Sequence, residues 1–504
     1  MRTDLESFTG GAPPIRVRRV NQAPVRADGS FVLYWMIAAR RPHSNFALDR
    51  AVAWAAELRR PLVVLESLRV DYPFASERLH RFVLDGMAAN RAAFAGTPVL
   101  YRPYIEPKPG EGRGLVEALG AEAVVIVTDD FPAFFLPAAV AAVGARLPVR
   151  LEAVDSNGIL PLAAVPQAYP AAVHHRRFMQ GALRSHLTFI PAELPDFAAL
   201  PSAHTSVLAA IEARWPAASE LLLTGGTSGL GALPIDHSAG AVNMVGGFVE
   251  ARKRLRRFVE RLLPKYHDGH NHPDENGTSR LSPYLHFGHI SAHEVFTAVM
   301  RSEEWNLGRL GDKPTGARQG WWGVGPAAEA FLDQLVVWRE LAYGTCYHRP
   351  SDYDAFESLP SWAIESLDRH TSDRRPFLYS FEQFEQGATH DPLWNAAQFE
   401  MLREGWMHNY LRMLWGKKIL EWSRTPREAL DTMVRLMNRW CVDGRDPNSY
   451  AGYFWTLGRY DRPWPERPVY GVIRSMSSQN AAKKLKLDAY LRTYSPGGSG
   501  SLFD

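Results

Sequence analysis

The stretch Phe31-Val32-Leu33-Tyr34-Trp35-Met36 predicts the architecture of the first part of the chain. Its consecutive apolar and aromatic residues suit a strand that is buried on both faces of a sheet. Four later runs share this character and comprise residues 61–65, 99–101, 123–127 and 148–154. Ala-rich amphipathic stretches, such as residues 47–58, lie between these runs. Strands that alternate with helices predict an open, parallel α/β sheet with right-handed crossovers.

The rest of the chain divides into segments of different pattern. We predict an N-terminal arm at residues 1–30, the α/β domain at 31–175, an interdomain linker at 176–245, a helical domain at 246–494 and a disordered tail at 495–504. The glycine-rich run at residues 225–231 could be mistaken for a phosphate loop, but no Gly-Lys-Ser or Gly-Lys-Thr follows it. A flexible linker is the favoured interpretation of this run.

Composition places the chain among soluble globular proteins. At 504 residues it is too long for one ordinary core, so two domains are expected. No apolar run reaches the roughly 18 residues of a membrane span, and the acidic N-terminus at residues 1–6 lacks a signal core. Only Cys346 and Cys441 occur, so no disulfide framework is expected. We therefore expect a cytoplasmic protein, whose net charge of +3 says little about its partners.

Two nearby stretches combine charges with large aromatic residues, namely residues 443–455 (DGRDPNSYAGYFW) and 407–415 (MHNYLRMLW). Both lie in a region of strong helical character. A plain hydrophobic core would avoid these charges, because an ion buried without partners costs several kcal/mol. The mixture instead suits a cavity that holds a flat polar heterocycle beside a second flat group.

A third stretch, residues 279–288 (SRLSPYLHFG), predicts the start of a helix. Ser282 suits the N-cap position, and Pro283 suits the first helical position. The free N–H groups of a helix N-terminus, together with nearby hydroxyls, form an anion site that suits a pyrophosphate. A simple capped helix is the alternative for this stretch taken alone.

These stretches resemble the class II cyclobutane pyrimidine dimer (CPD) DNA photolyases, a branch of the photolyase/cryptochrome family. The resemblance runs from residues 16–21 (RVRRVN) to residues 474–477 (RSMS). It implies a Rossmann-like α/β domain followed by an all-helical domain that binds FAD. It also implies a deoxyribodipyrimidine photo-lyase, in which reduced FAD absorbs blue light and passes an electron to a dimer flipped out of DNA. Such a protein can hold a second, antenna chromophore in its N-terminal domain.

The resemblance implies an FAD site that draws on all three stretches. The expected cofactor-binding residues are Tyr266, Ser279, Leu281, Ser282, Leu285, Arg412, Asn438, Asp443, Gly444 and Asn448. Residues 279–288 match the family's flavin-phosphate segment. Asn438 matches an asparagine near flavin N5, and Asp443 would meet the pyrimidine edge of the flavin. Three histidines at residues 267–272 suggest a metal site, but no regular element fixes their imidazoles and no metal is expected.

The lesion pocket implied by the resemblance includes two residues of one predicted helix. Gln334 and Trp338 are four residues apart, so they share one helix face. The family stacks an aromatic residue at the position of Trp338 against the lesion, but it usually has Glu at position 334. Glutamine keeps a hydrogen-bond donor and has neither an acid proton nor a charge. The other expected substrate-binding residues are Met413, Trp455, Arg462, Trp464 and Arg474.

Met413 bears on the kind of lesion, because (6-4) photolyases have a catalytic histidine at the corresponding place. Trp455 matches the second aromatic wall of the lesion pocket. Arg462, Trp464 and Arg474 resemble the family's DNA-facing loop. Arginines there can bind phosphates or fill the gap left by an extruded lesion.

Three tryptophans, Trp394, Trp415 and Trp422, match the family's electron-transfer residues, and with Gln334 and Asn438 they complete the expected catalytic set. Trp415 and Trp422 are seven residues apart. On one helix they would share a face with about 10 Å of rise, which allows an electron to hop between the surface and the flavin. A helix core stripe has the same period, so plain packing is the alternative.

Two other functions compete with repair. A cryptochrome-like blue-light photoreceptor would keep the flavin and the tryptophans but signal through conformation, and a structural helical protein would need neither. Trp338, Met413 and Trp455 favour repair, because a sensor does not need a lesion pocket. Gln334 points toward signalling or an altered lesion preference. The expected partner is DNA that contains pyrimidine dimers. We expect the protein to be a monomer and to bind no membrane.

Overall fold

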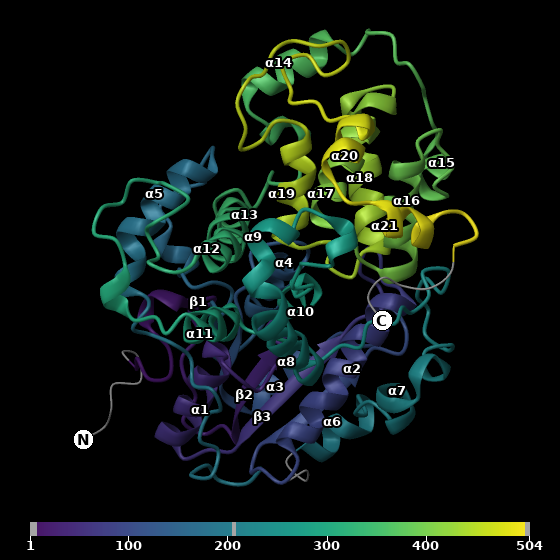
Figure 1. Ribbon diagram of the computed structural model, residues 1–504. Coiled ribbons are helices and arrows are strands. Elements are labelled where there is room, and N and C mark those ends of the chain that lie inside the picture. Colours follow the sequence, from purple (N-terminus) through teal and green to yellow (C-terminus); the bar gives the residue numbers. More distant parts are fainter. Residues whose placement is uncertain (1–7, 204–207, 499–504) are drawn as a thin grey trace.

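The computed structural model describes residues 8–203 and 208–498. Its α/β domain contains one six-stranded sheet with the order β1-β6-β5-β2-β3-β4 (Figure 1). The strands are β1 (Val17–Arg19), β2 (Phe31–Met36), β3 (Leu62–Leu68), β4 (Leu100–Ile105), β5 (Ala123–Asp129) and β6 (Leu151–Val154). All neighbouring strands are parallel except β1 and β6. The predicted fold class, a parallel α/β domain followed by a helical domain, is confirmed.

The strand that the sequence did not predict is β1, which lies inside the expected N-terminal arm. Val17 pairs with Val154, so β1 extends the sheet beyond β6. Arg16, just before this strand, is buried and donates to the carbonyl oxygens of Gly158 and Ile159. Short edge strands often carry charges, which hide them from a search for apolar runs.

Helices cover both faces of the sheet. They are α1 (Phe46–Leu58), α2 (Glu77–Phe94), α3 (Leu115–Glu122) and α4 (Leu136–Gly144). α1 packs against Val32 and Val64 on one face, whereas α3 and α4 pack against Leu33 and Ile126 on the other. The strand order reverses between β2 and β5. The carboxyl ends of these two strands therefore open a crevice of the kind where α/β sheets bind ligands.

The predicted linker at residues 176–245 is folded where the structure describes it. Met179 and Leu183 lie in the core of the helical domain, whereas later residues pack on the α/β domain. The linker contains most of α5 (Ala172–Ala182) and all of α6 (Ala209–Arg214) and α7 (Glu220–Thr224), and residues 204–207 lie outside the described part. Leu223 and Leu230 are buried against Leu84 of α2. The glycine-rich run forms a 3-10 turn (Gly226–Gly229) beside α2, rather than the predicted flexible linker.

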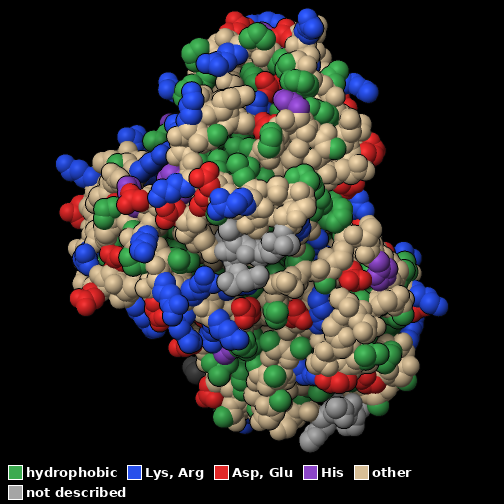
Figure 2. Space-filling model, turned by 45° about the vertical axis from the view of Figure 1, so that its right-hand side comes forward, with side chains coloured by type: hydrophobic (Ala, Val, Ile, Leu, Met, Phe, Trp, Pro, Cys, Tyr) green, Lys and Arg blue, Asp and Glu red, His purple; other side chains and the backbone are tan. Residues whose placement is uncertain are grey.

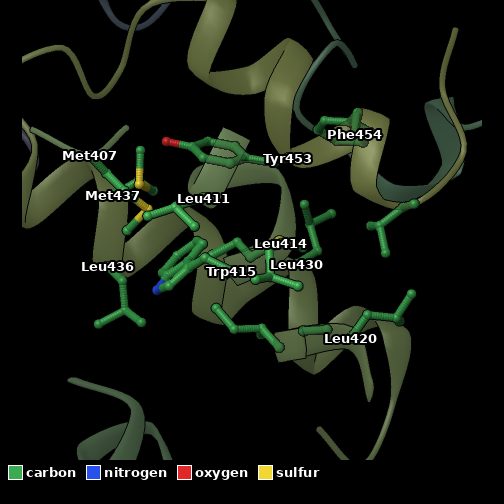
Figure 3. Packing of buried hydrophobic residues seen from close by; sticks show 14 of the residues in the cluster. Met407, Leu411, Leu414, Trp415, Leu420, Leu430, Leu436, Met437, Tyr453 and Phe454 are labelled. Carbon is green, nitrogen blue, oxygen red and sulfur yellow. The ribbon is translucent and has the colours of Figure 1, made fainter. Parts of the chain in front are cut away.

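The second domain is helical in the described residues after 246. Its helices are α8 (Phe248–Arg257), α9 (Tyr266–Gly269), α10 (Ser282–His286), α11 (Ala292–Ser302), α12 (Pro326–Leu332), α13 (Arg339–His348), α14 (Ser361–Arg369), α15 (Phe381–Glu385), α16 (Pro392–Glu404), α17 (Asn409–Trp422), α18 (Pro426–Trp440), α19 (Pro447–Thr456), α20 (Ser478–Lys484) and α21 (Asp488–Tyr494). Apolar side chains from α17, α18 and α19, among them Trp415, Met437 and Tyr453, form its core (Figure 3). Most of the predicted tail, residues 499–504, lies outside the described part.

Polar contacts join the two domains. Arg78 of α2 donates to the carbonyl oxygen of Leu402 at 2.7 Å. Glu340 of α13 accepts from the backbone N–H groups of Ile159 (2.6 Å) and Leu160 (3.0 Å), which follow β6. Burial raises the pKa of Glu340 to about 7. These bonds fix the helical domain at the carboxyl edge of the sheet.

The surface carries charges of both signs. Figure 2 shows Lys and Arg side chains gathered to the left of the grey residues. Because the net charge is only +3, a strong positive field must come from local groups of cations rather than from the whole molecule. Among the described residues, no helix is both long and apolar enough to cross a membrane.

Candidate functional site

The expected phosphate segment lies at the start of α10. The helix begins at Ser282 with Pro283 in its first turn, and Leu281 occupies the N-cap position without a side-chain cap. The prediction that Ser282 caps the helix is therefore wrong, because its hydroxyl accepts a hydrogen bond from the Trp406 indole N–H at 3.3 Å. The Ser279 hydroxyl accepts from the N–H of Leu281 at 3.4 Å. The Trp406 bond joins this segment to the predicted stretch at residues 407–415, which begins directly after Trp406.

Arg412 of α17 and Asp443 of the turn before α19 form an ion pair at 3.2 Å. Asp443 is buried and Arg412 is half-buried. Burial lowers the pKa of Arg412, but the charge and hydrogen bond of Asp443, together with smaller contributions from Cys441 and Tyr453, outweigh burial and raise it. The Arg412 Nε atom is buried and has no hydrogen-bond partner in the described residues. This spare donor suits a polar ligand, because an unsatisfied buried donor costs about 1–3 kcal/mol.

A buried amide holds the turn between α18 and α19. The Asn438 Oδ1 atom accepts from the backbone N–H of Arg445 at 2.9 Å and from the Tyr453 hydroxyl at 3.1 Å. A Cβ atom at Gly444 would lie 2.5 Å from the Met437 carbonyl oxygen, so only glycine fits there. The oxygen of Asn438 thus holds the turn, and its side-chain amide also hydrogen-bonds with Tyr450.

The other expected cofactor residues differ in exposure. Tyr266 is buried, and its ring stacks on that of His270 at 4.7 Å. Leu281 is buried in the core, so its side chain serves packing. Leu285 is half-buried, and Asn448, in the first turn of α19, is exposed.

A π-helical turn, η10 (Asp333–Trp338), carries the two residues expected to face a lesion. Turns of this type are frequent at functional sites. Gln334 is exposed although the residues on either side of it are buried, and Trp338 is half-buried. The ring of Trp338 meets that of Tyr460 edge-on, at 6.5 Å and 78°. Both side chains therefore emerge from an otherwise buried segment, as a binding surface requires.

The predicted DNA-facing loop lies beside Trp455. The Arg474 guanidinium is 5.9 Å from the Trp455 ring and 4.9 Å from the Trp464 ring, and that of Arg462 is 5.2 Å from the Trp464 ring. Both arginines are exposed and form no ion pair with any described residue. Met413 is half-buried on α17. Aromatic rings interleaved with unpaired arginines are typical of surfaces that bind nucleic acids.

A buried lysine that the sequence pattern did not single out lies against Trp455. Lys417 is fully buried, and its Nζ atom is 4.8 Å from the centre of the Trp455 ring. Nζ donates to the carbonyl oxygen of Thr456 at 2.7 Å. Burial lowers the pKa of Lys417 to about 7 despite the opposing charge of Asp461. Its place one helical turn after Met413, on the same face, is the signal that could have found it.

The three expected electron-transfer tryptophans are fully buried and contact one another. The Trp394 ring lies parallel to that of Trp415 at 6.2 Å and meets that of Trp422 at 6.0 Å and 65°. Trp394 of α16 therefore lies between the two tryptophans of α17, so the contact path crosses between helices instead of following one helix. The Trp415 indole N–H donates to Gln398 at 2.9 Å. Tyr379 covers the outer tryptophan, Trp422, at 5.6 Å.

A second network outside the predicted set joins α10, α13 and α19. Asp446, the N-cap of α19, accepts from the Tyr343 hydroxyl at 2.9 Å and contacts His286 Nδ1 at 3.2 Å. Burial lowers the pKa of His286, so its neutral ring donates through Nδ1. Burial opposes the charge on Asp446, yet the contact with His286 helps to hold its pKa below the usual value. The network ties the phosphate segment to residues 443–455.

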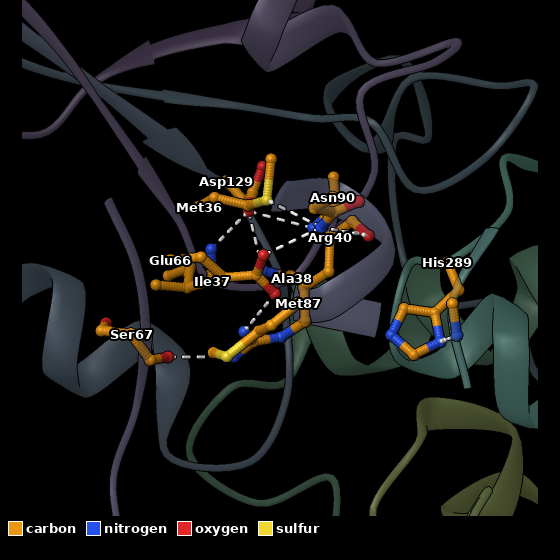
Figure 4. A network of polar contacts seen from close by, with 12 residues as sticks. Met36, Ile37, Ala38, Arg40, Glu66, Ser67, Met87, Asn90, Asp129 and His289 are labelled. Carbon is orange, nitrogen blue, oxygen red and sulfur yellow. Dashed lines mark hydrogen bonds and ion pairs between the residues drawn. The ribbon is translucent and has the colours of Figure 1, made fainter. Parts of the chain in front are cut away.

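A cavity of about 860 Å³ lies at the carboxyl edge of the sheet, near the strand-order reversal. Its walls are largely aromatic and include Trp35, Tyr72, Tyr104, Phe131, Phe134 and Phe135. Beside it, Asp129 accepts the backbone N–H groups of residues 37–39 at 2.7–3.0 Å, and Arg40 pairs with Glu66 at 3.0 Å (Figure 4). The cavity reaches Arg445 of the helical domain, so it backs onto the turn held by Asn438.

Comparison with known proteins shows to which family the chain belongs. No family model matches the chain. A deoxyribodipyrimidine photo-lyase of Methanothermobacter thermautotrophicus is 32% identical over 486 residues, which cover 94% of this chain and 97% of that protein. One of Potorous tridactylus is 31% identical over 488 residues, which cover 95% of this chain and 84% of that protein. The chain belongs to the photolyase/cryptochrome family.

A solved structure of the photolyase/cryptochrome family supports the fold. A bacterial class III photolyase from Agrobacterium tumefaciens matches with a TM-score of 0.68 at 19% identity, over 92% of this chain and 86% of that one. The predicted enzyme class, a deoxyribodipyrimidine photo-lyase, is confirmed by the near-full-length relatives of that name. The class within the family stays a prediction.

Members of the photolyase/cryptochrome family bind FAD, and the described residues fit this cofactor. The Arg412 Nε atom and the Thr278 hydroxyl are buried without a hydrogen-bond partner in the described part. Thr278 adjoins Ser279 of the phosphate segment. These two buried polar atoms are therefore available to a ligand.

Proposed function

We propose that this protein repairs cyclobutane pyrimidine dimers in DNA by light-driven electron transfer, as a class II photolyase. The observation that carries the proposal is the exposed amide of Gln334 beside the half-buried indole of Trp338, on a π-helical turn. A flipped pyrimidine can stack on an aromatic ring and accept hydrogen bonds at its carbonyl groups. A neutral donor next to a flat ring suits both needs.

Four residues would hold the dimer. Trp338 and Trp455 stack its two pyrimidine rings, and the Gln334 N–H group donates to a carbonyl oxygen. Met413 fills the apolar side of the pocket. Because a neutral amide carries no acid proton and no positive charge, Gln334 would stabilise the dimer anion less than a protonated carboxyl group or a cationic donor would.

Other residues would hold the cofactor, which when bound supplies light absorption and the transferred electron. Arg412 and Asp443 bind the polar edge of the ring system. Asn438 donates its NH2 group to the same ring system, and Ser279 and Ser282 bind the phosphates. This assignment uses the unpartnered Nε atom of Arg412 and needs no rearrangement of the ion pair.

The buried tryptophans would supply electrons to an oxidised cofactor. Trp415 lies three residues after Arg412 and is the donor nearest to the proposed ring site. Trp394, whose ring is 6.2 Å away, refills Trp415, and Trp422 refills Trp394. Because the path ends inside the protein at Trp422, its covering residue Tyr379 would control access from solvent.

We also propose that the cavity of about 860 Å³ holds an antenna chromophore. Its aromatic walls suit a planar ring system, and its site at a strand-order reversal is typical of ligand sites in α/β sheets. Native purification followed by absorption spectroscopy tests this. A second absorbing compound that is lost on Phe134→Ala, with flavin retained, is the expected result.

Gln334 itself favours a second candidate, a protein with another lesion preference or a photoreceptor, because the family usually has glutamate there. We expect CPD splitting per absorbed photon to rise on Gln334→Glu and to fall on Gln334→Ala at unchanged flavin content. The assay uses thymine-dimer DNA in light and in darkness. If the wild type and Gln334→Glu both hold reduced flavin and split no CPD in light, the second candidate replaces the first.

A further inference from the structure

The loop between α11 and α12 is fastened to α5 by two buried side chains. Arg176 donates to the carbonyl oxygen of Gly316 at 3.1 Å. The Gln180 amide accepts from the N–H of Gly316 at 2.7 Å and donates to the carbonyl oxygen of Ala317 at 3.0 Å. Gly316 has φ of 79°, and a Cβ atom there would lie 2.9 Å from the Val173 carbonyl oxygen. Sterics and hydrogen bonds therefore hold the loop in one place on α5.

The same unit adjoins the proposed lesion pocket. Arg176 forms an ion pair with Asp333, the first residue of the π-helical turn that carries Trp338, at 2.7 Å. Ala171, just before α5, pairs with Tyr460, whose ring meets that of Trp338. Figure 1 shows α5 next to α12, which leads into this turn. α5 and the loop therefore lie directly beside the pocket.

The outer side of this unit carries cations without partners. Arg177, Lys313 and Arg318 are exposed, and none forms an ion pair with a described residue. The Cβ atom of Arg177 lies 3.3 Å from where a Cβ at position 316 would be, so it borders the loop. The acid of the loop, Asp312, is itself exposed and lies 3.9 Å from Arg184. Three exposed cations without ion-pair partners in the described residues thus lie on α5 and the adjoining loop, which buried hydrogen bonds hold in place.

We propose that α5 and residues 311–320, together the α5 shelf, bind backbone phosphates of the DNA beside the lesion pocket. The inference rests on the proposed function, because the polyanion it fits is the DNA that carries the lesion. Tyr460 joins the shelf to the DNA-facing loop, since it pairs with Ala171 and precedes Arg462 by two residues. Cations on both elements would let the protein grip the backbone on two sides of the extruded nucleotides.

Phosphate contacts have a measurable signature. Each one contributes a slope of about −0.9 to a plot of log affinity against log salt concentration for duplex DNA. Loss of two contacts should therefore flatten the slope by about 1.8. It should also weaken damaged and undamaged DNA alike, because phosphates carry no information on the lesion.

The test is a fluorescence anisotropy titration of full-length protein with a CPD duplex and a matched undamaged duplex at several salt concentrations. The double variant Arg177→Gln/Arg318→Gln should flatten the slope and lower both affinities about five- to tenfold. Arg177→Lys/Arg318→Lys should restore both, because it keeps the charges. Arg59→Gln/Lys108→Gln removes two exposed cations of the α/β domain and should leave the slope unchanged.

The outcomes separate this inference from the proposed function. If the Gln double variant keeps the wild-type slope and affinity, or weakens only damaged DNA, the α5 shelf is not a phosphate grip. Repair at saturating protein should be unaffected in that variant, since the pocket is intact. If the Gln double variant flattens the salt slope as expected but the wild type never repairs CPD, the proposed function is overturned. The assignment of the α5 shelf as a phosphate-binding surface is then retained.

Discussion

Two groups of tryptophans lie in the same helical domain in opposite surroundings. The rings of Trp394, Trp415 and Trp422 are fully buried, contact one another and lie in the continuous core of α16 and α17. Trp338 and Trp455 are half-buried and border exposed glutamine and arginine side chains. One residue type therefore lies in two different environments, one a closed core and the other a partly open surface.

The comparison separates stability from binding. A fully buried indole contributes its whole apolar surface to folding, and its removal leaves a cavity that the structure fills only in part. A half-buried indole at the edge of a pocket contributes less to folding and offers a free ring surface to a ligand. Variants of the two groups should therefore fail in different assays.

The largest expected effect is that of Trp394→Ala on folding. This change should lower the free energy of unfolding by about 3–5 kcal/mol, whereas Trp338→Ala should lower it by about 1 kcal/mol or less. For binding of a CPD duplex the order should reverse, because stacking is worth roughly 1–3 kcal/mol per base. Urea unfolding and DNA titration of both variants provide the measurements. Equal losses of stability would contradict the distinction between the groups.

The next effect concerns Lys417, the buried lysine that lies against the ring of half-buried Trp455. Its pKa of about 7 lies below the ordinary value for lysine, so folding disfavours its charged form. Above the unfolded pKa near 10.4 the amine is neutral in both the folded and the unfolded state, so no charge is buried. Below about pH 7 it is charged in both states, and the full free-energy cost of burying the charge lowers stability. The wild type should therefore gain stability relative to Lys417→Met as pH rises from 7 to 10.

The gain for Lys417 should reach a few kcal/mol, since each pKa unit is worth about 1.4 kcal/mol. Urea unfolding of both proteins at pH 7 and pH 9.5 measures it, and other groups that titrate cancel in the difference. Lys418→Met is the matched control, because Lys418 pairs with Glu421 at 2.6 Å. A stability difference that stays constant with pH would show that Lys417 is not a buried cation in the native state.

Apolar patterns predicted the part of the fold that burial determines. The run at Phe31–Met36 forms β2 with the bounds expected from the sequence, because both faces of the sheet are covered. β1 was missed because it is short and two of its three residues are arginines, which bond the carbonyl oxygens of residues 21–23 and a distant carboxylate. Arg18, for example, bonds Asp130 at 2.6 Å, a contact that no local pattern encodes.

The sequence named candidate residues for the site but did not predict how they contact one another. Arg412 and Asp443, each expected at the cofactor, form an ion pair that the sequence did not predict. The N-cap role of Ser282 was wrong because Trp406, distant in sequence, donates to its hydroxyl. The order of the buried tryptophans could not follow from spacing on α17 either, since Trp394 comes from another helix. Spacing describes one element at a time, whereas sites form where elements meet.

A smaller effect should separate the two tryptophan groups by electron transfer. Trp415→Phe should slow light-driven reduction of oxidised flavin at least tenfold, about 1.4 kcal/mol in the barrier, because phenylalanine breaks the contact with Trp394. Repair by protein that is already reduced should persist. Trp464→Phe, a half-buried tryptophan outside the buried group, is the control and should leave photoreduction unchanged. Time-resolved absorption measures reduction; equal loss of both activities at normal flavin content would make Trp415 structural.

The smallest effect concerns the surface contacts that hold the loop of Trp464. His370 lies 2.6 Å from Asp373 and 2.9 Å from Glu466, and the N–H of Val469 donates to Asp373 at 2.8 Å. The hydrogen bond with Asp373 is the main cause that raises the pKa of His370, followed by that with Glu466.

The stability that protonated His370 gives to the folded loop should therefore be fully present below its unfolded pKa near 6.5. It should be lost as pH rises through the higher folded pKa. Because Glu466 is 55% exposed, salt screens the pair and we expect only about 0–1 kcal/mol. His370→Asn should speed amide hydrogen exchange at Val469 relative to wild type at pH 5.5, and the two proteins should converge at pH 8.5. Amides of α16 around Trp394 should not respond, since a buried core does not depend on this surface charge. A difference that persists at pH 8.5 would mean that packing of the imidazole, and not its charge, holds the loop.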